Sequence, residues 1–421
     1  MKVHPILLVA LICFALGSSV HSQGVYKPIP PGFDFPADQD ALIKMRDNKD
    51  VAAMRRHGWM VFAGLTQPAR PDEANSEAVW ETWYQGGEVF APAGPSPQGA
   101  KKKRVFTPLK QSQVAGAGPQ AAGQSVASFT LFNQETKDHI RTNGYQMAQT
   151  MDNLNAQWPA PTFPKDRKIK DFPRPSMSLK TTWWVVKKNE KSGMYIWDEK
   201  PEADPAANQP APTWKRAVVI DPTRDQIPAD EKVDISIRGK NFPGSHVVPL
   251  KSFYYFVATA EDLPSLNAAP VGLGEDPNLG RVEIGDFLVL AGFHYTTKEI
   301  PDWVWATFWW HDHPTEGQFG QDRPDDTLLK GVWRNYKMDV ALDMTNPREP
   351  DGKPNAIFNP WLEARFGNGV HSNCMTCHQL ATWPRRDFTP ITRGPLPPDA
   401  PRFKDTTKTD FLWSLMVEGG Q

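Results

Sequence analysis

The feature that most constrains the fold is a series of short β-rich runs between residues 181 and 310. Each run is rich in aromatic and β-branched residues and is bounded by turn-forming residues. No strongly helical pattern lies between the runs, which favours an antiparallel sheet or sandwich. The sequence therefore predicts a large β-rich domain over residues 177–350. The runs are 181–186, 194–197, 214–220, 233–237, 253–257, 287–290 and 303–310.

The chain before this domain has a mixed pattern. Residues 37–57 and 134–156 have apolar side chains at helical spacing, and residues 59–62 predict a strand. Residues 91–125 are dominated by Ala, Gly, Pro, Ser and Gln, which is typical of a low-complexity loop. We expect a mixed N-terminal region over residues 23–176.

The first residues have the pattern of an export signal. Lys2 gives a basic start, residues 6–16 are an apolar run too short to span a membrane, and small residues follow up to Ser22. This pattern predicts a signal peptide over residues 1–22, cleaved near Ser22, and a periplasmic location. No later stretch is apolar enough to predict a transmembrane segment.

The cysteines are few and closely spaced. Cys13 lies in the predicted signal peptide, so only Cys374 and Cys377 would remain after cleavage. They stand in Cys374-Met-Thr-Cys377-His378, the spacing used for covalent attachment of haem c. Each thiol can form a thioether to the porphyrin, and His378 would be the proximal iron ligand.

Two other kinds of site also use a C-x-x-C pair. A zinc site would need a second pair of ligands at similar spacing, and no further cysteine follows Cys377. A thiol redox site of the thioredoxin type would follow a strand near the start of a βαβ unit, whereas this motif is near the end of the chain. Covalent haem is therefore the favoured interpretation.

The C-terminal stretch as a whole resembles a known family. A predicted helix at 359–366, the C-x-x-C-H motif, a Pro-rich loop and a closing helix capped by Thr409 follow one another. This order resembles the cytochrome c domain from near Phe358 to the end of the given sequence, and we place the predicted haem domain at residues 351–421. The resemblance implies a small all-α domain that holds one covalent haem c. The expected fold class is α+β, with the β-rich region preceding this domain.

The second axial ligand of the iron is the point where the sequence departs from that family. There, a Met in the loop before the closing helix usually fills this role, but residues 379–409 contain neither Met nor His. His311 and His313 are candidates because two residues apart on a strand place both side chains on one face. Met177 and Met416 are candidates as thioether ligands.

The two histidines have other interpretations. Together with His294 from a preceding strand, His311 and His313 could form a three-histidine copper or zinc site. They could also be polar residues at a strand end, where Pro314 marks the exit. The sequence leaves these alternatives open.

Two classes of function remain. The chain carries 47 Lys and Arg against 48 Asp and Glu, which argues against nucleic acid as a partner. The first class is electron transfer through the haem to a redox partner protein. The second is a haem-dependent oxidoreductase or sensor with an open distal iron position, formed with the β-rich domain and accessible to a small-molecule substrate. The absence of a methionine from the loop favours the second class. No motif in the sequence identifies a particular reaction.

Overall fold

The computed structural model describes most of the chain after the predicted signal peptide. The signal peptide itself and most of the 91–125 loop lie outside the described residues. The described residues are 25–73, 76–91, 104–108, 127–158, 167–197, 214–267, 281–345, 357, 359–362, 373–384 and 394–417.

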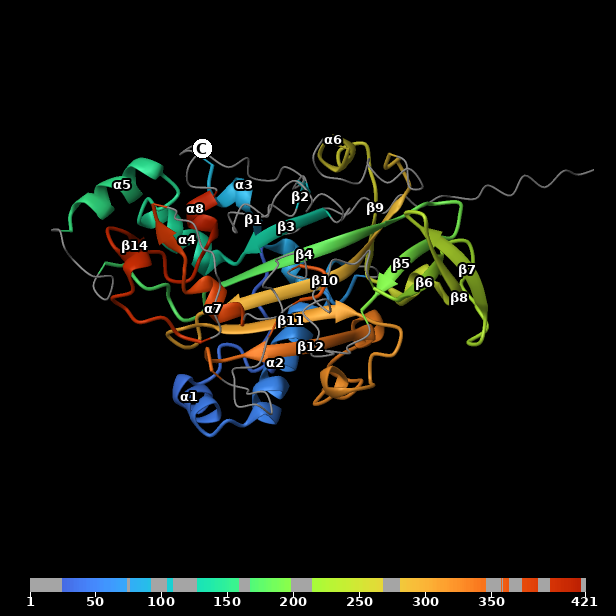
Figure 1. Cartoon of the computed structure of the whole chain (residues 1–421), viewed down its shortest axis with the longest axis horizontal. Coiled ribbons are helices and arrows are strands. Elements are labelled where there is room, and N and C mark those ends of the chain that lie inside the picture. Colours follow the sequence, from blue (N-terminus) through green and yellow to red (C-terminus); the bar gives the residue numbers. More distant parts are fainter. Residues whose placement is uncertain are drawn as a thin grey trace, which may run out of the picture.

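A large antiparallel sheet forms the centre of the molecule (Figure 1). Its strand order is β1-β3-β4-β10-β11-β12, with β2 paired to β3 and β9 paired to β10. The structure therefore confirms an α+β protein built on a large antiparallel sheet. The eight strands are β1 (Tyr84–Gln85), β2 (Thr107–Pro108), β3 (Ala127–Phe132), β4 (Met177–Val186), β9 (Tyr255–Val257), β10 (Phe287–Thr297), β11 (Val304–Trp310) and β12 (Tyr336–Ala341).

A second, four-stranded sheet lies at one end of the large sheet, on the right in Figure 1. Its order is β5-β6-β8-β7; the β6–β8 pair is parallel and the other two pairs are antiparallel. Its strands are β5 (Ser192–Ile196), β6 (Arg216–Asp221), β7 (Lys232–Ile237) and β8 (Lys240–Pro249). A two-stranded sheet, β13 (Thr382–Trp383) with β14 (Thr407–Lys408), lies in the C-terminal region.

The helices are short and lie around the large sheet. None of those in the described ranges is long and apolar enough to cross a membrane. The α-helices are α1 (Gln39–Asp47), α2 (Val51–Leu65), α3 (Gly86–Val89), α4 (Gln134–Thr142), α5 (Ala148–Ala156), α6 (Leu263–Leu266), α7 (Cys374–His378) and α8 (Ser414–Val417). The 3-10 helices are η1 (Val79–Thr82), η6 (Leu250–Ser252), η8 (Gln318–Gly320), η9 (Gly331–Asn335) and η11 (Pro401–Phe403).

The helical prediction near the N-terminus is partly wrong. Residues 37–57 contain two helices because Lys49 adopts a left-handed φ of 58° between them. Asp38 caps α1 and Asp50 caps α2, each accepting a hydrogen bond from a backbone N–H three residues on. Residues 59–62, predicted as a strand, lie inside α2, where their apolar side chains are suited to a buried helix. Short apolar runs do not distinguish the two structures.

Helix α2 covers one face of the large sheet. Phe62 stacks on Phe308 of β11 with ring centroids 3.9 Å apart. The Tyr295 hydroxyl of β10 donates a hydrogen bond to the Gly58 carbonyl at 2.8 Å. A Cβ on Gly58 would lie 2.8 Å from Met338 of β12, so this glycine permits the close approach of helix and sheet.

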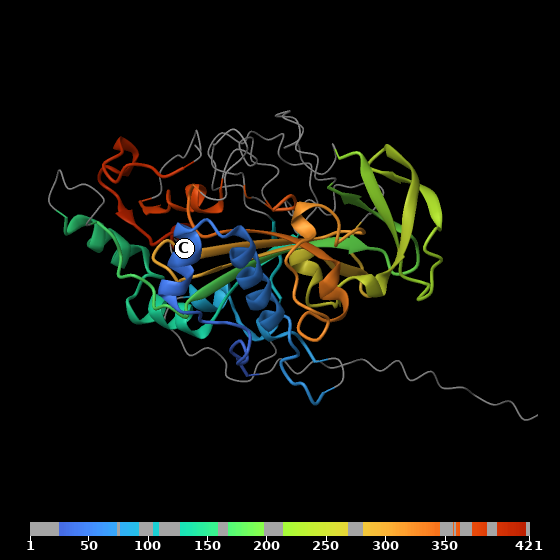
Figure 2. The same ribbon diagram turned by 90° about the horizontal axis from the view of Figure 1, so that it is seen from below.

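The C-terminal segment, by which we mean the described part of residues 351–421, covers the opposite face of the large sheet. The sheet therefore lies between this segment and α2 (Figure 2). Fully buried Asn359 donates from Nδ2 to Thr307 Oγ1 and to the Phe308 carbonyl, both at 2.8 Å. Its Oδ1 accepts from the backbone N–H groups of Trp361 and Leu362, as an N-cap does. One side chain thus fixes the start of the C-terminal segment to β11.

The described part of residues 351–421 does not show the all-α fold predicted for it. Helix α7 has five residues and α8 has four, and the β13–β14 pair lies between them. The closing helix begins at Ser414 rather than after Thr409, because Asp410 and Phe411 have left-handed φ values of 49° and 65°. Residues with such φ values cannot continue a right-handed helix.

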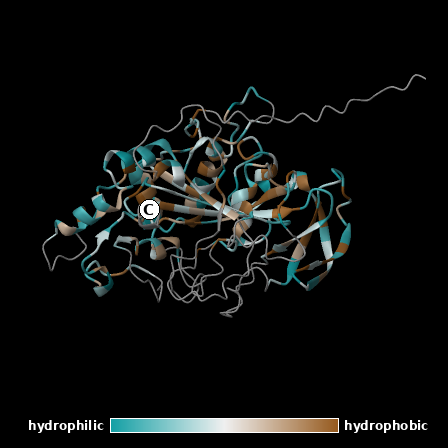
Figure 3. Cartoon of the chain, turned by 90° about the horizontal axis from the view of Figure 1, so that it is seen from above, coloured by the Kyte–Doolittle hydropathy of each residue, from teal (hydrophilic) through white to brown (hydrophobic). Residues whose placement is uncertain are grey.

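Strands of the large sheet come from both sides of residue 177. β1, β2 and β3 precede it, and β3 pairs directly with β4. Figure 3 shows hydrophobic residues gathered along the middle of the molecule, with hydrophilic residues more frequent at both ends. One connected core of buried residues accordingly joins α2, the large sheet and the four-stranded sheet.

Candidate functional site

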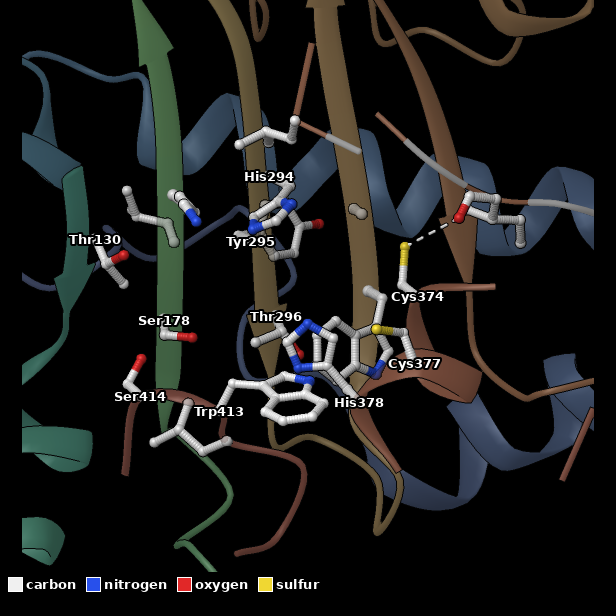
Figure 4. A pocket seen from close by; sticks show the side chains of 17 residues that line it. Thr130, Ser178, His294, Tyr295, Thr296, Cys374, Cys377, His378, Trp413 and Ser414 are labelled. Carbon is white, nitrogen blue, oxygen red and sulfur yellow. Dashed lines mark hydrogen bonds between the residues drawn. The ribbon is translucent and has the colours of Figure 1, made fainter. Parts of the chain in front are cut away.

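A pocket lies between the large sheet and the C-terminal segment. The sheet contributes side chains from β3, β4, β10 and β11, and the C-terminal segment contributes α7 and the start of α8 (Figure 4). Cys374, Cys377 and His378 all line it. The three residues singled out by the C-x-x-C-H motif therefore face one cavity, and a sheet forms its far wall.

Helix α7 presents the motif. Asn373 is buried and caps this helix, accepting at Oδ1 from the Met375 N–H at 3.0 Å. Both cysteines are half-buried and are not joined by a disulfide, and Cys374 Sγ donates to the Ile357 carbonyl at 3.4 Å. The two cysteines are three residues apart, slightly less than one helical turn of about 3.6 residues, so the two sulfurs lie on the same side of α7.

The tautomer of His378 follows from its hydrogen bond. Nδ1 lies 2.8 Å from the Phe411 carbonyl oxygen, and because a carbonyl can only accept, Nδ1 carries the proton. Nε2 then holds a lone pair, which is the arrangement that metal-binding histidines use. The pKa of His378 is lowered to about 3, chiefly by burial and also by neighbouring His294 and Lys180, against the opposing effect of the Phe411 hydrogen bond. The ring is therefore neutral at physiological pH.

Two tryptophans pack around the His378 ring. The Trp305 ring of β11 lies 4.2 Å from it between centroids, and the Trp413 ring lies 6.3 Å away. Trp305 is itself fixed by a hydrogen bond from Nε1 to the Asp302 carbonyl. The imidazole is thus held by a hydrogen bond on one side and by aromatic packing on the other.

The sheet wall opposite α7 carries polar side chains. His294 of β10 pairs with Lys180 of β4 and Thr307 of β11, and Thr296 pairs with Ser178. Alternation along a strand puts His294 and Thr296 on the same face as their cross-strand neighbours. Figure 4 shows His294 reaching from β10 into the pocket that His378 enters from α7.

One polar atom in the pocket lacks a partner. Thr296 is only 6% exposed, and its Oγ1 has no hydrogen-bond partner among the residues that the structure describes. A buried hydroxyl without a partner costs free energy, on the order of 1–3 kcal/mol. The pocket therefore has a polar group that an occupant or an ordered water would satisfy.

The donor set of this pocket fits a covalent haem. Two thiols on one side of a helix can attach to one edge of a porphyrin, and a neutral imidazole with a free Nε2 follows them directly. The rest of the lining includes the apolar side chains of Leu362, Leu412 and Trp413, which suit contact with a porphyrin plane. The described residues contain no group of three or more His, Cys, Asp or Glu side chains arranged to hold a bare metal ion.

The structure places His311 and His313 away from this pocket. Both follow the last residue of β11, whereas the pocket is lined by Trp305 near its start. Six residues along a strand separate Trp305 from His311 by about 20 Å. His294 pairs with Thr307, so it also lies well short of His311. His294, His311 and His313 therefore do not form the three-histidine site that was one of the alternatives left open by the sequence.

His311 and His313 have polar neighbours of their own. The buried His311 Nδ1 accepts a hydrogen bond from the His313 backbone N–H at 2.9 Å. Burial lowers the pKa of His311 to about 2, with nearby Lys337 and Arg216 adding to the effect. Asp312 pairs with Arg216 of β6. These contacts join β11 to the four-stranded sheet, which agrees with the interpretation as polar residues at a strand end.

The two methionine candidates are placed differently. Met177, the first residue of β4, is fully buried in the main core and is not among the residues lining the pocket. Met416 is in α8, but its side chain lies outside the described residues. The structure therefore gives no support to Met177 as an iron ligand.

Sequence reasoning missed most of the sheet wall. His294 was considered only with His311 and His313, and Lys180, Thr296 and Trp305 were not considered as site residues. The only sign of these residues in the sequence was alternation along a strand, since His294 and Thr296 are two residues apart and so lie on one face. Nothing in the sequence indicates that this face lies opposite the C-x-x-C-H motif.

Comparisons with protein-family models, with curated protein sequences and with solved structures found no significant match to this chain. Functional inference therefore depends on the pocket itself.

Proposed function

We propose that this chain is an exported mono-haem c-type cytochrome, which transfers electrons through one covalently bound haem to a periplasmic redox partner protein. The observation that most supports the proposal is the arrangement at α7. Cys374 and Cys377 face the same pocket as His378, and the Phe411 carbonyl fixes the His378 tautomer that leaves Nε2 available. The predicted signal peptide supports export to the compartment where this attachment chemistry takes place.

Each residue of the site has a distinct role in this proposal. The thiols of Cys374 and Cys377 would hold the porphyrin by thioether bonds, and His378 Nε2 would bind the iron. The bound haem would supply a one-electron iron couple. Phe411 orients the proximal imidazole, because outer hydrogen bonds fix the direction and basicity of a ligating histidine. The sheet wall and the two tryptophans would keep water from the haem.

A second candidate function is supported by the wall of the pocket. Because β4, β10 and β11 form the side facing α7, the distal side of a haem would be formed by the sheet, with Lys180, His294 and Thr296 beside it. Such a polar wall could also receive a small-molecule ligand, as in an oxidoreductase or a haem-based sensor. The two functions differ in whether the sixth iron position is filled.

The experiment is to produce the full chain in a bacterium that matures c-type cytochromes, then to extract the purified protein with acid acetone. Wild type and Asp171→Asn, an exposed surface variant, should keep their haem. The double variant Cys374→Ala with Cys377→Ala should lose covalent haem completely. Haem that remains bound in the double variant after extraction, or a wild type without haem, would overturn the proposal.

A further inference from the structure

Resting on the proposed function, we infer that His294 of β10 is the second axial ligand of the haem iron, opposite His378. His294 is the only imidazole besides His378 among the described residues that line the pocket. The two side chains come from different walls, His294 from the sheet and His378 from α7 (Figure 4). A porphyrin between the sheet and α7 would have one histidine on each side.

The position of His294 is rigid. Its backbone lies in β10, which is paired with β4 on one side and with β11 on the other. The neighbouring Gly292 is closely packed, since a Cβ there would lie 2.9 Å from Asn359 Oδ1 and 2.5 Å from Thr182 Oγ1. A side chain on such a strand needs little reorganisation to bind a metal.

The other nitrogen and oxygen donors of the pocket are less suitable. The Tyr295 hydroxyl is directed to the other face, where it donates to the Gly58 carbonyl. Lys180 lines the pocket, but an ammonium group has only donors and no lone pair with which to bind iron. An imidazole is therefore the stronger candidate at neutral pH.

This assignment has a consequence for function. Two histidine ligands would make the iron six-coordinate, and an added ligand such as carbon monoxide would then have to displace His294. The assignment therefore favours electron transfer over the second candidate function. It also accounts for the absence of Met and His from residues 379–409, because the ligand comes from the sheet instead of the loop.

The test compares wild type with His294→Ala, using the visible spectrum of the reduced protein with and without carbon monoxide. The wild-type spectrum should not change on adding the gas. His294→Ala should keep its covalent haem, show a shifted Soret band with carbon monoxide, and return towards the wild-type spectrum when free imidazole is added. The matched control His313→Ala, whose side chain lies beyond the end of β11 and outside the pocket, should behave as wild type does.

A second variant keeps the test valid if the alanine protein fails to fold. His294→Met preserves bulk and replaces the imidazole by a thioether, which should raise the reduction potential of the haem. An unchanged spectrum and carbon monoxide response in His294→Ala, with haem still covalently attached, would overturn the ligand assignment and leave the proposed function intact. A wild-type protein without covalent haem would overturn both.

Discussion

Asp410 and Lys298 form a buried salt bridge, with 2.5 Å between Oδ1 and Nζ. Asp410 Oδ2 also accepts from the Phe172 backbone N–H at 3.0 Å. The next residue after Asp410 is Phe411, whose carbonyl accepts the hydrogen bond from His378. This ion pair therefore ties the end of β10 to the backbone that orients the proximal imidazole.

We expect Asp410→Asn to destabilise the protein by about 3 kcal/mol, because it leaves the Lys298 ammonium buried without its counter-charge. Urea unfolding followed by tryptophan fluorescence measures this change. Asp171→Asn removes an exposed pair with Lys168 at 2.9 Å and should cost less than about 1 kcal/mol. Equal costs for the two variants would contradict the structural role given to the buried pair.

Gly292 is a place where three segments meet. A Cβ there would lie 2.5 Å from Thr182 Oγ1, 2.9 Å from Asn359 Oδ1 and 3.1 Å from Trp361 Cβ. Gly292→Ala should therefore destabilise the protein by roughly 2 kcal/mol through overpacking. Gly87 in α3 has no heavy atom within 4 Å of its Cβ position, so Gly87→Ala should be neutral or slightly stabilising. A thermal unfolding comparison that shows no difference between the two would count against the close packing of the C-terminal segment.

The unpartnered hydroxyl of Thr296 predicts an unusual response to substitution. Thr296→Val removes the buried Oγ1 while keeping the side-chain shape, so it should stabilise the haem-free double-alanine variant by about 1 kcal/mol. Urea unfolding in that background measures the change. The matched control is Thr136→Val, which should destabilise because Thr136 Oγ1 lies within hydrogen-bond distance of Asn133 Oδ1 and accepts from the Met177 backbone N–H. A similar loss of unfolding free energy in both variants would show that Thr296 Oγ1 does have a hydrogen-bond partner.

The buried His57 predicts a dependence of stability on pH. Burial alone would lower its pKa, but the neighbouring carboxylates of Asp34 and Glu299 outweigh this and raise the pKa to about 9. A folded-state pKa above the unfolded value of about 6.5 means that the stabilisation is fully present below pH 6.5. It is lost as the pH rises through 9, by roughly 3 kcal/mol in total.

The measurement is urea unfolding of wild type between pH 6 and pH 10, compared with His57→Gln. Wild type should lose stability over this interval, whereas the glutamine variant should be less stable at pH 6 and show a flatter profile. Parallel profiles for the two proteins would mean that His57 is not the titrating group. The two ion pairs that would be lost when His57 loses its proton are Nε2 with Glu299 at 3.1 Å and Nδ1 with Asp34 at 3.6 Å.

Most of the β-rich runs in the sequence became strands, whereas β8 and β12 were among the strands that were missed. The run at 287–290 became part of β10, and the run at 303–310 became β11. β12 was missed because the charged residues Lys337 and Asp339 alternate with its apolar residues. Both charged side chains are buried in the folded protein. β8 was missed because it contains Pro243 and Gly244, which are typical of turns.

The sequence by itself determined the part of the candidate site that the C-x-x-C-H motif forms. Cys374, Cys377 and His378 are neighbours in the chain, and the short helix α7 that carries them depends on local spacing and on the Asn373 cap. Such features follow from interactions within a few residues, which a sequence pattern records directly.

Only the tertiary structure decided what faces that motif. His294 is 84 residues before His378 in the sequence, and it reaches the pocket because β10 pairs with β4 and β11 while Asn359 and Asp410 fix the C-terminal segment across them. His311 and His313 stand out in the sequence but lie beyond the far end of β11. Strand register and long-range packing set these positions, and neither has a signature in local residue spacing.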